Sequence, residues 1–441
     1  MYCSWGYPHE THQATLRCNW RNESLQFSDN IEEPELYLPY GCGRSYGDVC
    51  LNDSQTLITT QQLNHFIEFD NNKGLVRVES GVTLDRLLEV IVPQGWFVPV
   101  TPGTRFVTIG GMIANDVHGK NHHNAGTFGC HVTQFELVRS NGERLLCSPT
   151  TNEALYNATI AGLGLTGLIT WVEIKLKKIA NNYIAMNAVK IENLQHYFEL
   201  EKNQQSEYTV AWIDTLASGE QLGRGVYFSG EHADISNTDE VDMAQFNHLK
   251  KKLSVPFNLP VKTLNKYTVQ LFNAIYIRNA VSNQNDSNDL NHYEEYFYPL
   301  DNILHWNRIY GKAGLYQHQC VVPEHDAQAT LTEILNVVSK EDNSSFLSVL
   351  KKFGTIASPG LMSFPRPGFT LAMDFSRRGT KTVKLLETLN DIVASAGGAI
   401  YPAKDAIMSK QLFQQSYSNL DQFSEYIDPK FSSSFWRRVT A

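Results

Sequence analysis

The sequence lacks the features that mark a membrane-spanning or an exported protein. No run of eighteen apolar residues occurs in it, so a helix that crosses a bilayer is not expected. The first residues, MYCSWGYPHETHQ, contain neither a basic region nor an apolar stretch, so no secretory signal is predicted. Together these two absences predict a cytoplasmic protein.

Basic charge and paired cysteines are also scarce. Lysine and arginine total 37 against 46 aspartate and glutamate, a net charge of −9, which argues against a nucleic-acid partner because its phosphates require a basic surface. The seven cysteines are odd in number and none forms a CxxC pair, so neither a disulfide framework nor a structural zinc site is predicted. We expect Cys42, Cys130, Cys147 and Cys320 to be small buried hydrophobic residues.

What is present predicts a folded protein of several domains. A chain of 441 residues is too long for one hydrophobic core, so about two to three domains are expected. Hydrophobic residues make up 42% of the chain and charged residues 19%, close to the averages of globular proteins.

Short β-rich runs alternate with glycine turns in the first part of the chain. Strands are expected at 57–60, 75–79, 135–138 and 168–176. Residues 83–91 have apolar side chains at helical spacing, and Thr83 can accept a hydrogen bond from the first turn, so a helix is predicted there. This region extends from about residue 35 to 180, and Asn181 and Asn182 mark its predicted boundary.

The composition changes after this boundary. A longer strand is expected at 208–213, and polar loops are expected at 231–242 and 282–292. The second loop, SNQNDSNDLNH, has the composition of a mobile surface segment.

Residues 397–401 begin with two glycines and are predicted to be a strand that returns to the first domain. The sequence therefore predicts a discontinuous first domain, residues 1–182 and 399–441. The second domain is inserted into it as residues 183–398.

One glycine-rich segment, residues 99–131, is the most informative part of the chain. It reads PVTPGTRFVTIGGMIANDVHGKNHHNAGTFGCH and holds six glycines, four histidines and one lysine. Glycine lets the backbone approach a ligand closely, and the small residues of 110–115, with free amides, suit a buried diphosphate. The imidazoles and the ammonium that follow can hydrogen-bond a redox ring or its substrate. The segment is therefore predicted to wrap around a large phosphorylated cofactor, with the chemistry at its far end.

A second glycine cluster, GCGRSYGD at 41–48, follows the apolar segment 37–40. Closely spaced glycines let successive N–H groups point inward as an anion-binding nest. A glycine-rich hairpin without a ligand explains the same pattern equally well. The glycines at 41, 43 and 47 do not make a dinucleotide fingerprint, because the last of them is one residue too far away.

A formal GxGxxG does occur at 162–167, but the run after it has a β pattern. The dinucleotide-binding mechanism needs a strand before the loop and a helix after it, so the Rossmann interpretation is rejected. These amides and Thr166 either meet a nucleotide in a different fold or form a simple turn.

His118 and His122 are four residues apart, which is the spacing of zinc ligands on a helix. Gly119 weakens a helix, and no HExxH motif and no cysteine or carboxylate set lies nearby, so a metal site is the less favoured interpretation. A third interpretation of this segment is a solvated polar loop. The position directly after Gly110 and Gly111 favours an active-site loop.

Four polar residues later in the chain are ambiguous by themselves. Gln317 and Gln319 are two residues apart on a predicted strand, so their side chains share one face. They can bind a sugar or a phosphate there, or lie on a half-exposed strand, and Lys351 has the same ambiguity. Lys404 would stabilise negative charge on a reduced flavin ring, although taken alone it reads as an exposed lysine before a helix.

Taken in order, these motifs resemble one family closely. They are GRSYGD (43–48), the 99–129 block, GLGLTGLI (162–169), NKYT (265–268), YPLD (298–301) with Trp306 and Asn307, FPRPG (364–368), YPAKD (401–405) and DPKF (428–431). The chain is similar to the FAD-dependent oxidases of the vanillyl-alcohol-oxidase fold, and specifically to the decaprenylphosphoryl-β-D-ribose 2′-oxidases. The 99–129 block is specific to this family, whereas the short C-terminal motifs support the resemblance only because they occur in the same order.

The resemblance implies an α+β fold, in which a VAO/PCMH-type FAD-binding domain made of both chain ends carries an inserted α+β substrate domain on an antiparallel sheet. It implies oxidation of the ribose 2′-hydroxyl of a polyprenyl-phosphoryl sugar to a ketone, the first half of an epimerisation to the arabinose of cell-wall arabinan. The implied partners are the lipid-linked sugar phosphate and an NAD-dependent reductase that acts on the keto product. A lipid-linked substrate also implies peripheral contact with the inner face of the membrane.

The same resemblance implies roles for individual residues, none of them at a metal. The catalytic candidates are Lys404, His118, Tyr46 and Lys120. The cofactor-binding candidates are Gly41, Gly43, Arg44, Ser45, Tyr46, Gly47, Pro102, Gly103, Thr104, Thr108, Gly110, Gly111, Ala114, Asn115, His118, Gly119, Asn121, Gly126, Gly164, Gly167, Ile169, Tyr401 and Lys404. The substrate-binding candidates are Lys120, Trp212, Gln317, Gln319, Lys351, Thr370, Ala372 and Lys404.

The sequence departs from the family pattern at a few positions. Many relatives of the wider fold attach flavin through a histidine where this chain has Arg44, so non-covalent FAD is predicted unless His118 or a neighbour takes that role. Thr370 and Ala372 stand where the family has an asparagine and a cysteine, so the covalent adduct with nitroaromatic inhibitors cannot form. Phe297 replaces a pocket tyrosine and removes a hydroxyl donor. We expect an altered inhibitor response and a retained redox reaction, with a sugar or lipid that can differ.

The expected chemistry places a secondary alcohol carbon about 3–3.5 Å from the flavin N5, with a base in reach of the hydroxyl proton. Lys404 is expected to stabilise the negative charge of the reduced flavin ring. His118, Lys120 and Tyr46 are candidates for substrate binding and proton transfer, and the sequence does not rank them. Lys351, Gln317 and Gln319 are expected to hold the sugar or the phosphate. Two other functions stay open. One is an FAD-dependent oxidase of a free sugar, alditol or aldonolactone with a closed pocket. The other is a flavin-binding protein without turnover.

Overall fold

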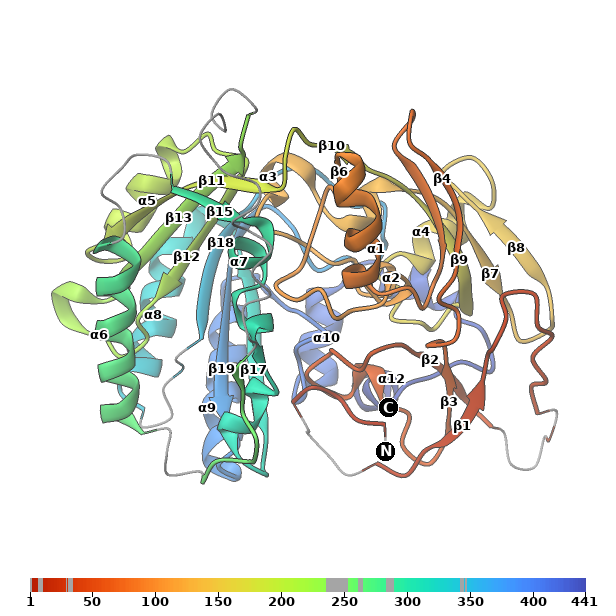
Figure 1. Cartoon of the computed structure of the whole chain (residues 1–441). Coiled ribbons are helices and arrows are strands. Elements are labelled where there is room, and N and C mark those ends of the chain that lie inside the picture. Colours follow the sequence, from red (N-terminus) through yellow and green to blue (C-terminus); the bar gives the residue numbers. More distant parts are fainter. Residues whose placement is uncertain are drawn as a thin grey trace.

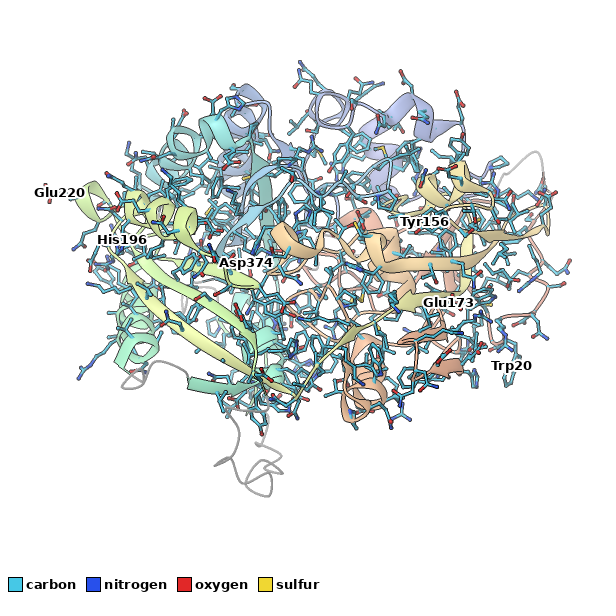
Figure 2. The ribbon with its side chains drawn as sticks, turned by 90° about the horizontal axis from the view of Figure 1, so that it is seen from above. Trp20, Tyr156, Glu173, His196, Glu220 and Asp374 are labelled. Carbon is cyan, nitrogen blue, oxygen red and sulfur yellow. The ribbon has the colours of Figure 1, made fainter. Side chains whose placement is uncertain are left out.

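Two antiparallel sheets lie side by side and form the body of the molecule (Figure 1). The computed structural model describes residues 2–6, 11–28, 30, 35–234, 253–260, 265–282, 289–341, 345 and 347–441. Within this part, one sheet has five strands in the order β4-β5-β9-β7-β8, and the other has eight in the order β15-β11-β13-β12-β18-β19-β17-β20. Seen from above, Trp20 and Glu220 mark opposite ends of the molecule, and Asp374 lies between them (Figure 2).

The five-stranded sheet carries one of the hydrophobic cores. Its strands are β4 (Phe66–Asp70), β5 (Leu75–Glu79), β7 (Val132–Val138), β8 (Arg144–Cys147) and β9 (Leu168–Lys175). Strand alternation buries Val76 and Val78 on β5, and Val172 and Ile174 on β9. The helices packed into this core are α1 (Leu84–Ile91), α2 (Ile109–Ala114) and α4 (Glu153–Thr159).

A small parallel sheet ties the two ends of the chain together. It contains β1 (Ala14–Arg17), β3 (Thr56–Thr59) and β2 (Tyr37–Tyr40). The Tyr37 N–H donates to the Lys430 carbonyl at 2.8 Å, and the Ser432 N–H donates to the Tyr37 carbonyl at 3.0 Å. The C-terminal helices are α10 (Lys410–Ser416), α11 (Leu420–Ser424) and α12 (Ser434–Thr440). Arg438 of α12 pairs with Asp48 at 2.7 Å, so the end of the chain supports the 41–48 loop.

The eight-stranded sheet forms the other half. Its strands are β11 (Tyr183–Ile191), β12 (Tyr208–Ile213), β13 (Gly225–His232), β15 (Asp289–His292), β17 (Leu315–Val322), β18 (Ser348–Phe353), β19 (Gly368–Ser376) and β20 (Ala399–Ile400). The apolar stripes of α5 (Leu194–Asn203), α8 (Ala327–Ser339) and α9 (Thr380–Ser395) share a core with Leu371 and Met373 of β19. Because side chains alternate along a strand, Ala372 points to the other face, toward the first half.

Shorter elements complete the structure. Two more helices are α6 (Lys266–Ser282), which packs on β11 and β13, and α7 (Tyr293–Phe297), which follows β15. The remaining pieces are β6 (Trp96–Phe97) with β10 (Lys177–Lys178), β14 (Leu253–Ser254) with β16 (Ile303–Leu304), and α3 (His122–Ala125). In the part of the chain that is described, no helix has the length and apolar character needed to cross a membrane.

Most of the predicted elements are confirmed. β5 and β12 have the predicted bounds, and β3, β7 and β9 overlap the predicted strands. α1 begins after Thr83, whose hydroxyl accepts a hydrogen bond from the Arg86 N–H at 3.3 Å. The strand β9 directly follows the GxGxxG segment, so the rejection of the Rossmann interpretation is confirmed as well. The domain bounds at residues 182 and 399 stay predictions.

Two predictions about local structure were wrong. Residues 399–400 do form a strand, but β20 pairs with β17 and so belongs to the eight-stranded sheet. A Cβ at Gly398 would lie 2.4 Å from the Val321 carbonyl oxygen, so the glycine is what lets the chain close on β17.

The second error concerns the loop predicted at 282–292. Residues 289–292 are β15, which pairs with β11 at the edge of the sheet, and Ser282 still belongs to α6. An edge strand tolerates polar residues because one side faces solvent, which hid the strand in a polar sequence. Residues 283–288 and 235–242 lie outside the described part.

Candidate active site

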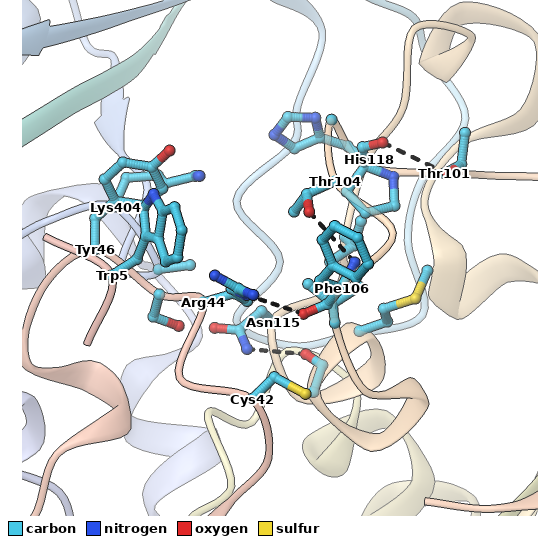
Figure 3. A pocket seen from close by; sticks show the side chains of 18 of the residues that line it. Trp5, Cys42, Arg44, Tyr46, Thr101, Thr104, Phe106, Asn115, His118 and Lys404 are labelled. Carbon is cyan, nitrogen blue, oxygen red and sulfur yellow. Dashed lines mark hydrogen bonds between the residues drawn. The ribbon is translucent and has the colours of Figure 1, made fainter. Parts of the chain in front are cut away.

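A cavity of about 840 Å³ lies between the two sheets. Its walls include Ile169 of β9 on one side and Trp212, Gln317, Lys351 and Ala372 of the eight-stranded sheet on the other. This volume is within the range of sites that enclose a cofactor or a drug-sized ligand. Figure 3 shows part of the cavity, with Lys404 and Tyr46 close together and Arg44 facing Phe106.

The first wall is built mostly from backbone. It is made of the 41–46 loop, the 101–120 segment and the turn that leads into β9. Within the described residues, the N–H groups of residues 41–45 donate to no protein acceptor, so they are available to a bound anion. This loop therefore has the property of the predicted nest.

The amides of residues 109–115, which belong to the glycine-rich segment 99–131, are already used. The N–H groups of Ile109 and Gly110 donate to the carbonyls of Val82 (2.9 Å) and Ser80 (2.8 Å). The Gly111 N–H donates to the Thr108 hydroxyl at 3.2 Å. The Met112 and Asn115 N–H groups likewise donate to the Thr108 and Gly111 carbonyls, so the prediction of free amides in 110–115 was wrong, because α2 is docked on the turn after β5 and capped by Thr108.

Glycine at this wall keeps the cavity open. Gly43 has φ +59°, and a Cβ there would lie 2.1 Å from the Tyr40 hydroxyl oxygen. A Cβ at Gly41 would lie 2.3 Å from the Thr108 hydroxyl oxygen, whereas a Cβ at Gly103 would meet nothing within 4 Å. Gly41 and Gly43 thus shape the loop itself, and Gly103 leaves room for whatever fills the cavity.

Two buried polar atoms on this wall are suited to bind a ligand with hydrogen-bonding groups. Within the described part, the Ser80 hydroxyl and the Asn115 side-chain oxygen are buried without a hydrogen-bond partner, and both residues line the cavity. Buried polar atoms are normally satisfied, so these two call for a ligand with donors and acceptors. The unpaired amides of 41–45, the open space at Gly103 and these atoms fit a dinucleotide such as FAD.

The second wall is built from side chains on three adjacent strands. Gln317 and Gln319 of β17 face the cavity together, as their spacing predicted. Ala372 of β19 lies opposite Gln319 in the register. Lys351 of β18 also faces the cavity, while the next residue, Lys352, points away and pairs with Glu324 at 2.8 Å.

His118 joins the two walls. Its Nδ1 lies 3.3 Å from the Lys351 Nζ, and its Nε2 lies 2.9 Å from the Gln319 amide nitrogen. Burial and then the charge of Lys351 hold the pKa of His118 well below its usual value, so the ring is neutral. A neutral ring that accepts from Gln319 at Nε2 carries its proton on Nδ1, and Nδ1–H then needs an unprotonated Lys351 as acceptor.

Lys351 is suited to that state. Burial, with a smaller contribution from the charge of Lys404, lowers the pKa of Lys351 to about 7. Lys351 also lies 3.3 Å from the Gly119 carbonyl oxygen, which accepts a hydrogen bond from it in either protonation state. The contact between His118 and Lys351 can therefore take up or release one proton near neutral pH.

Lys404 has a different environment. Its Nζ lies 3.9 Å from the centre of the Tyr46 ring. Burial lowers the pKa of Lys404, and the charge of Asp374 opposes that shift. Asp374 is fully buried on β19 and accepts a hydrogen bond from Gln317, and its other oxygen has no partner among the described residues. Asp374 therefore favours the charged form of Lys404, so that this lysine keeps a proton that Lys351 loses.

The outer end of the cavity is apolar and aromatic. Lys120 donates to the Tyr296 carbonyl and lies 4.0 Å from the centre of the Tyr296 ring. Burial and the charge of Lys351 lower the pKa of Lys120 to about 7. The rest of the lining near these segments is mostly apolar or aromatic (Met186, Val210, Trp212, Phe228, Tyr276, Phe297, Ile303 and Leu304) and also includes the polar residues Asn291, Glu295, Asp301 and His305.

Four of the predicted contact residues do not line the cavity. They are Gly47, Asn121, Gly126 and Thr370. Gly47 packs under the Asp405 carbonyl, and Gly126 has φ +67° and packs on Ile356. Asn121 donates to the Pro99 carbonyl at 2.8 Å, and Thr370 accepts from the Gln319 amide at 3.1 Å. These four residues contact other parts of the protein behind the cavity lining, and the spacing of residues in the sequence does not show this.

The other predicted residues converge on the cavity. They are Gly41, Gly43, Arg44, Ser45, Tyr46, Pro102, Gly103, Thr104, Thr108, Gly110, Gly111, Ala114, Asn115, His118, Gly119, Lys120, Gly164, Gly167, Ile169, Trp212, Gln317, Gln319, Lys351, Ala372, Tyr401 and Lys404. Their individual roles stay predictions.

Sequence reasoning missed several residues of the site. Trp5 lies 4.2 Å from the Arg44 guanidinium, and that guanidinium donates to the Phe106 carbonyl at 3.1 Å. No pattern in the neighbouring sequence identifies Trp5 as a site residue, because the N-terminal segment reaches the cavity only in the folded chain, where the Trp5 N–H donates to the Ser45 carbonyl. Asp374 could have been found from the sequence, because it is the only acidic residue of the predicted strand segment and, two positions from Ala372, lies on the same face.

The cysteine prediction holds for part of the set. Cys147 and Cys320 are buried, but Cys42 and Cys130 are half-buried. Cys42 lines the cavity, because the glycines on either side of it turn the loop outward from the core.

Comparisons with known proteins agree with this site. Residues 32–148 match the family described as FAD binding domain. The decaprenylphosphoryl-beta-D-ribose oxidase of Mycolicibacterium smegmatis is 33% identical over 411 residues, which cover 90% of this chain and 88% of that protein. A Streptomyces coelicolor protein, described as an uncharacterized protein in the mprA 5′ region, is 29% identical over 375 residues, covering 81% of this chain and all of that protein. The wild-type BBE-like 1 structure of Physcomitrella patens superposes with a TM-score of 0.64 at 12% identity, over 90% of this chain and 85% of that one.

The fold and the cavity define an FAD-dependent oxidoreductase that acts on a CH–OH group, and the predicted α+β fold of the VAO/PCMH type is confirmed. The chain belongs to the decaprenylphosphoryl-β-D-ribose oxidase family.

Proposed function

We propose that this protein oxidises the 2′-hydroxyl of a polyprenyl-phosphoryl ribose to the 2′-keto sugar. The observation that carries the proposal is the composition of one cavity along its length. One wall offers unpaired amides and glycines, half-buried lysines line the cavity, and apolar and aromatic side chains make up much of the remaining lining. A dinucleotide, an anionic sugar phosphate and an isoprenoid chain need these three environments.

FAD would be held by the first wall. The amides of 41–45, the Ser80 hydroxyl and the Asn115 side chain would bind its polar groups, and Gly103 would leave room for it. When bound, FAD supplies the acceptor for the two electrons and the hydrogen that leave the alcohol carbon. Arg44 offers no nucleophile for a covalent bond, so acid precipitation should release yellow FAD into the supernatant.

The neutral form of Lys351 would accept the hydroxyl proton of the substrate. An amine nitrogen has one lone pair, so Lys351 would turn from the His118 Nδ1–H to the substrate hydroxyl to take this proton, while one of its N–H groups stays on the Gly119 carbonyl and the Gln319 amide holds His118 in place. A base with a pKa near the working pH is the most effective for such a transfer. Thr370 holds Gln319 from behind, so it supports the base without touching substrate.

Lys404 would place a fixed positive charge where negative charge grows during the reaction. Its position against the Tyr46 ring restricts its movement, and Asp374 favours its protonated state. A charge that is already in place in a dry site costs no reorganisation at the moment of reaction. Lys120, between the lysine cluster and the apolar end, would bind the substrate phosphate.

The substrate and the product imply two further partners. A keto sugar must be reduced on the opposite face to complete an epimerisation, which requires a separate NAD-dependent reductase. A lipid-linked substrate requires the protein to meet a membrane, so we infer peripheral contact with the bilayer. We also propose a division into an FAD-binding domain, residues 1–182 and 399–441, and a substrate domain, residues 183–398, in which the pairing of β20 with β17 is a contact across the domain boundary.

The product identifies the reaction. Purified holoenzyme is incubated with polyprenyl-phosphoryl ribose, and the product is reduced with sodium borodeuteride and hydrolysed. Oxidation at C2′ predicts ribose and arabinose that carry one deuterium at C2, and the Lys404→Met variant should give almost none. Unlabelled sugar, or deuterium at another carbon, would refute the assignment. Turnover of free ribitol at the same rate would favour a soluble polyol as the substrate.

A further inference from the structure

Exposed apolar side chains gather in one stretch of the chain. In the described part, ten large apolar residues are exposed, and seven of them lie between residues 253 and 304. Among them, Leu253 is 71% exposed and Phe257 is 63% exposed. Soluble proteins scatter such residues singly, so a cluster of this kind marks an interaction surface.

The helix α6 presents one row of these residues. Tyr267, Leu271 and Ile275 are spaced four residues apart and form a single exposed ridge. The opposite side of the helix is occupied, because Val269 and Asn273 are buried against the sheet. The exposed ridge is therefore not part of the hydrophobic core, and α6 itself lies at one edge of the molecule (Figure 1).

The helix α6 also reaches the active-site cavity, because the exposed Phe272 stacks on Tyr276 with ring centres 6.0 Å apart. Tyr276, one residue after Ile275, lines the cavity and lies 4.8 Å from the Trp212 ring centre. Ile303 and Leu304 of β16 also line the cavity, and β16 pairs with β14, where Leu253 is exposed. Both α6 and the β14–β16 pair thus combine exposed apolar side chains with residues that line the cavity. We refer to α6 with β14 and β16 as the apolar rim.

The charge of this region differs from that of the whole chain. The protein carries a net charge of −9, but the sequence from Met243 to Asn285 contains no aspartate or glutamate. The basic residues of that stretch are Lys250, Lys251, Lys252, Lys262, Lys266 and Arg278. Lys266 and Arg278 are on α6 and are exposed beside the apolar ridge. Apolar residues flanked by basic ones are typical of a helix that lies in the surface of an anionic membrane.

We propose that the apolar rim docks on an anionic lipid bilayer, with Tyr267, Leu271 and Ile275 inserted among the acyl chains and Lys266 and Arg278 at the headgroups. The proposal rests in part on the proposed function, because the docked orientation would let an isoprenoid chain pass from the bilayer into the apolar end of the cavity. A second copy of this chain fits less well, because a symmetric contact would bring two basic stretches together.

The test compares two leucines. Leu271 on α6 is 64% exposed, and Leu146 on β8 is 42% exposed at the other half of the molecule. Holoenzymes of wild type, Leu271→Glu and Leu146→Glu are sedimented with vesicles of phosphatidylcholine that contain phosphatidylglycerol, and with vesicles of phosphatidylcholine alone. We expect wild type and Leu146→Glu to bind the anionic vesicles alike and Leu271→Glu to bind at least about 10-fold more weakly. Binding to pure phosphatidylcholine should be weak for all three.

Several results would overturn the proposal. They are equal vesicle binding by the two variants, no binding by wild type, or a dimer in solution that Leu271→Glu dissociates. Because Leu271 is outside the cavity, Leu271→Glu should keep its FAD and should oxidise a water-soluble short-chain substrate at the wild-type rate. Vesicle binding is measured without substrate, so wild type that binds vesicles but oxidises no lipid-linked ribose would refute the proposed function and leave the docking surface standing.

Discussion

The two walls of the cavity differ in what they present to a ligand. The 41–46 loop offers unpaired backbone N–H groups, and its glycines exclude side chains from the space. The wall of β17, β18 and β19 offers the side chains of Gln317, Gln319 and Lys351, placed by strand register. Backbone N–H groups do not titrate, so they suit a cofactor that stays bound throughout the reaction. Side chains whose pKa values depend on their surroundings suit a substrate that must lose a proton and a hydride. The comparison predicts that substitutions at the backbone wall change FAD affinity, whereas substitutions at the side-chain wall change the rate of flavin reduction.

The largest effect is expected for Lys404→Met on the side-chain wall. Removal of a fixed charge that acts in the transition state typically costs about 100- to 1,000-fold in rate. We therefore expect FAD content and fold to be retained, and flavin reduction in stopped-flow experiments to slow by about that factor. Lys410→Met, on the surface of α10, serves as the control. A Lys404→Met variant that reduces flavin at nearly the wild-type rate would remove this lysine from the mechanism.

Lys351→Met should have the next largest effect, together with a change in pH dependence. Lys351 is protonated below about pH 7 and neutral above it, because its pKa is lowered to about 7. If the neutral form is the base, the rate of flavin reduction should rise with pH through this region in wild type. In Lys351→Met the rate should fall by about 100-fold and the rise should disappear.

The matched control is Lys352→Met, one residue further along the same strand but on its other face. It should keep both the rate and the pH profile of wild type. A pH profile that is flat in wild type, or unchanged in Lys351→Met, would contradict the assignment of the base.

The backbone wall is tested by Gly43→Ala against Gly103→Ala. A Cβ at Gly43 meets the Tyr40 hydroxyl oxygen at 2.1 Å and requires a left-handed conformation, so the loop must distort. FAD affinity, measured by equilibrium dialysis, should fall by about 10-fold or more. Gly103→Ala should leave thermal unfolding of the FAD-free protein unchanged, because no protein atom lies within 4 Å of its Cβ. Equal FAD affinity for Gly43→Ala and wild type would show that the nest does not bind the cofactor.

The smallest effect on turnover is expected for Ala372→Cys. Ala372 lines the cavity opposite Gln319 and contributes no polar group, so turnover should stay within about twofold of wild type. The new thiol would stand where the family carries its cysteine, so mass spectrometry should detect a covalent adduct with nitroaromatic inhibitors in this variant. An adduct of the same yield in wild type would show that another thiol, such as Cys42, reacts.

Local patterns were sufficient for much of the fold. The Thr83 cap, the alternation of β5 and the common face of Gln317 and Gln319 depend on neighbouring residues, and all three could be read from the sequence. The sheet to which residues 399–400 belong could not, because strand pairing with β17 is a contact between residues far apart in the chain.

The site shows the same division. The glycines of the 41–48 loop are visible in the sequence, but the partners of the Ile109 and Gly110 amides are decided by the docking of α2 on the turn after β5. The pKa of Lys351 depends on burial between two halves of the molecule, which no local pattern encodes. The influence of Asp374 on Lys404 likewise required the register of β19 beside β17.

The most direct test of the account is anaerobic mixing of the yellow holoenzyme with polyprenyl-phosphoryl ribose while flavin absorbance is followed. The account predicts rapid bleaching with the lipid-linked sugar and none with free ribitol at the same concentration. Flavin that stays oxidised with the lipid-linked sugar, or that is bleached equally well by ribitol, would contradict it.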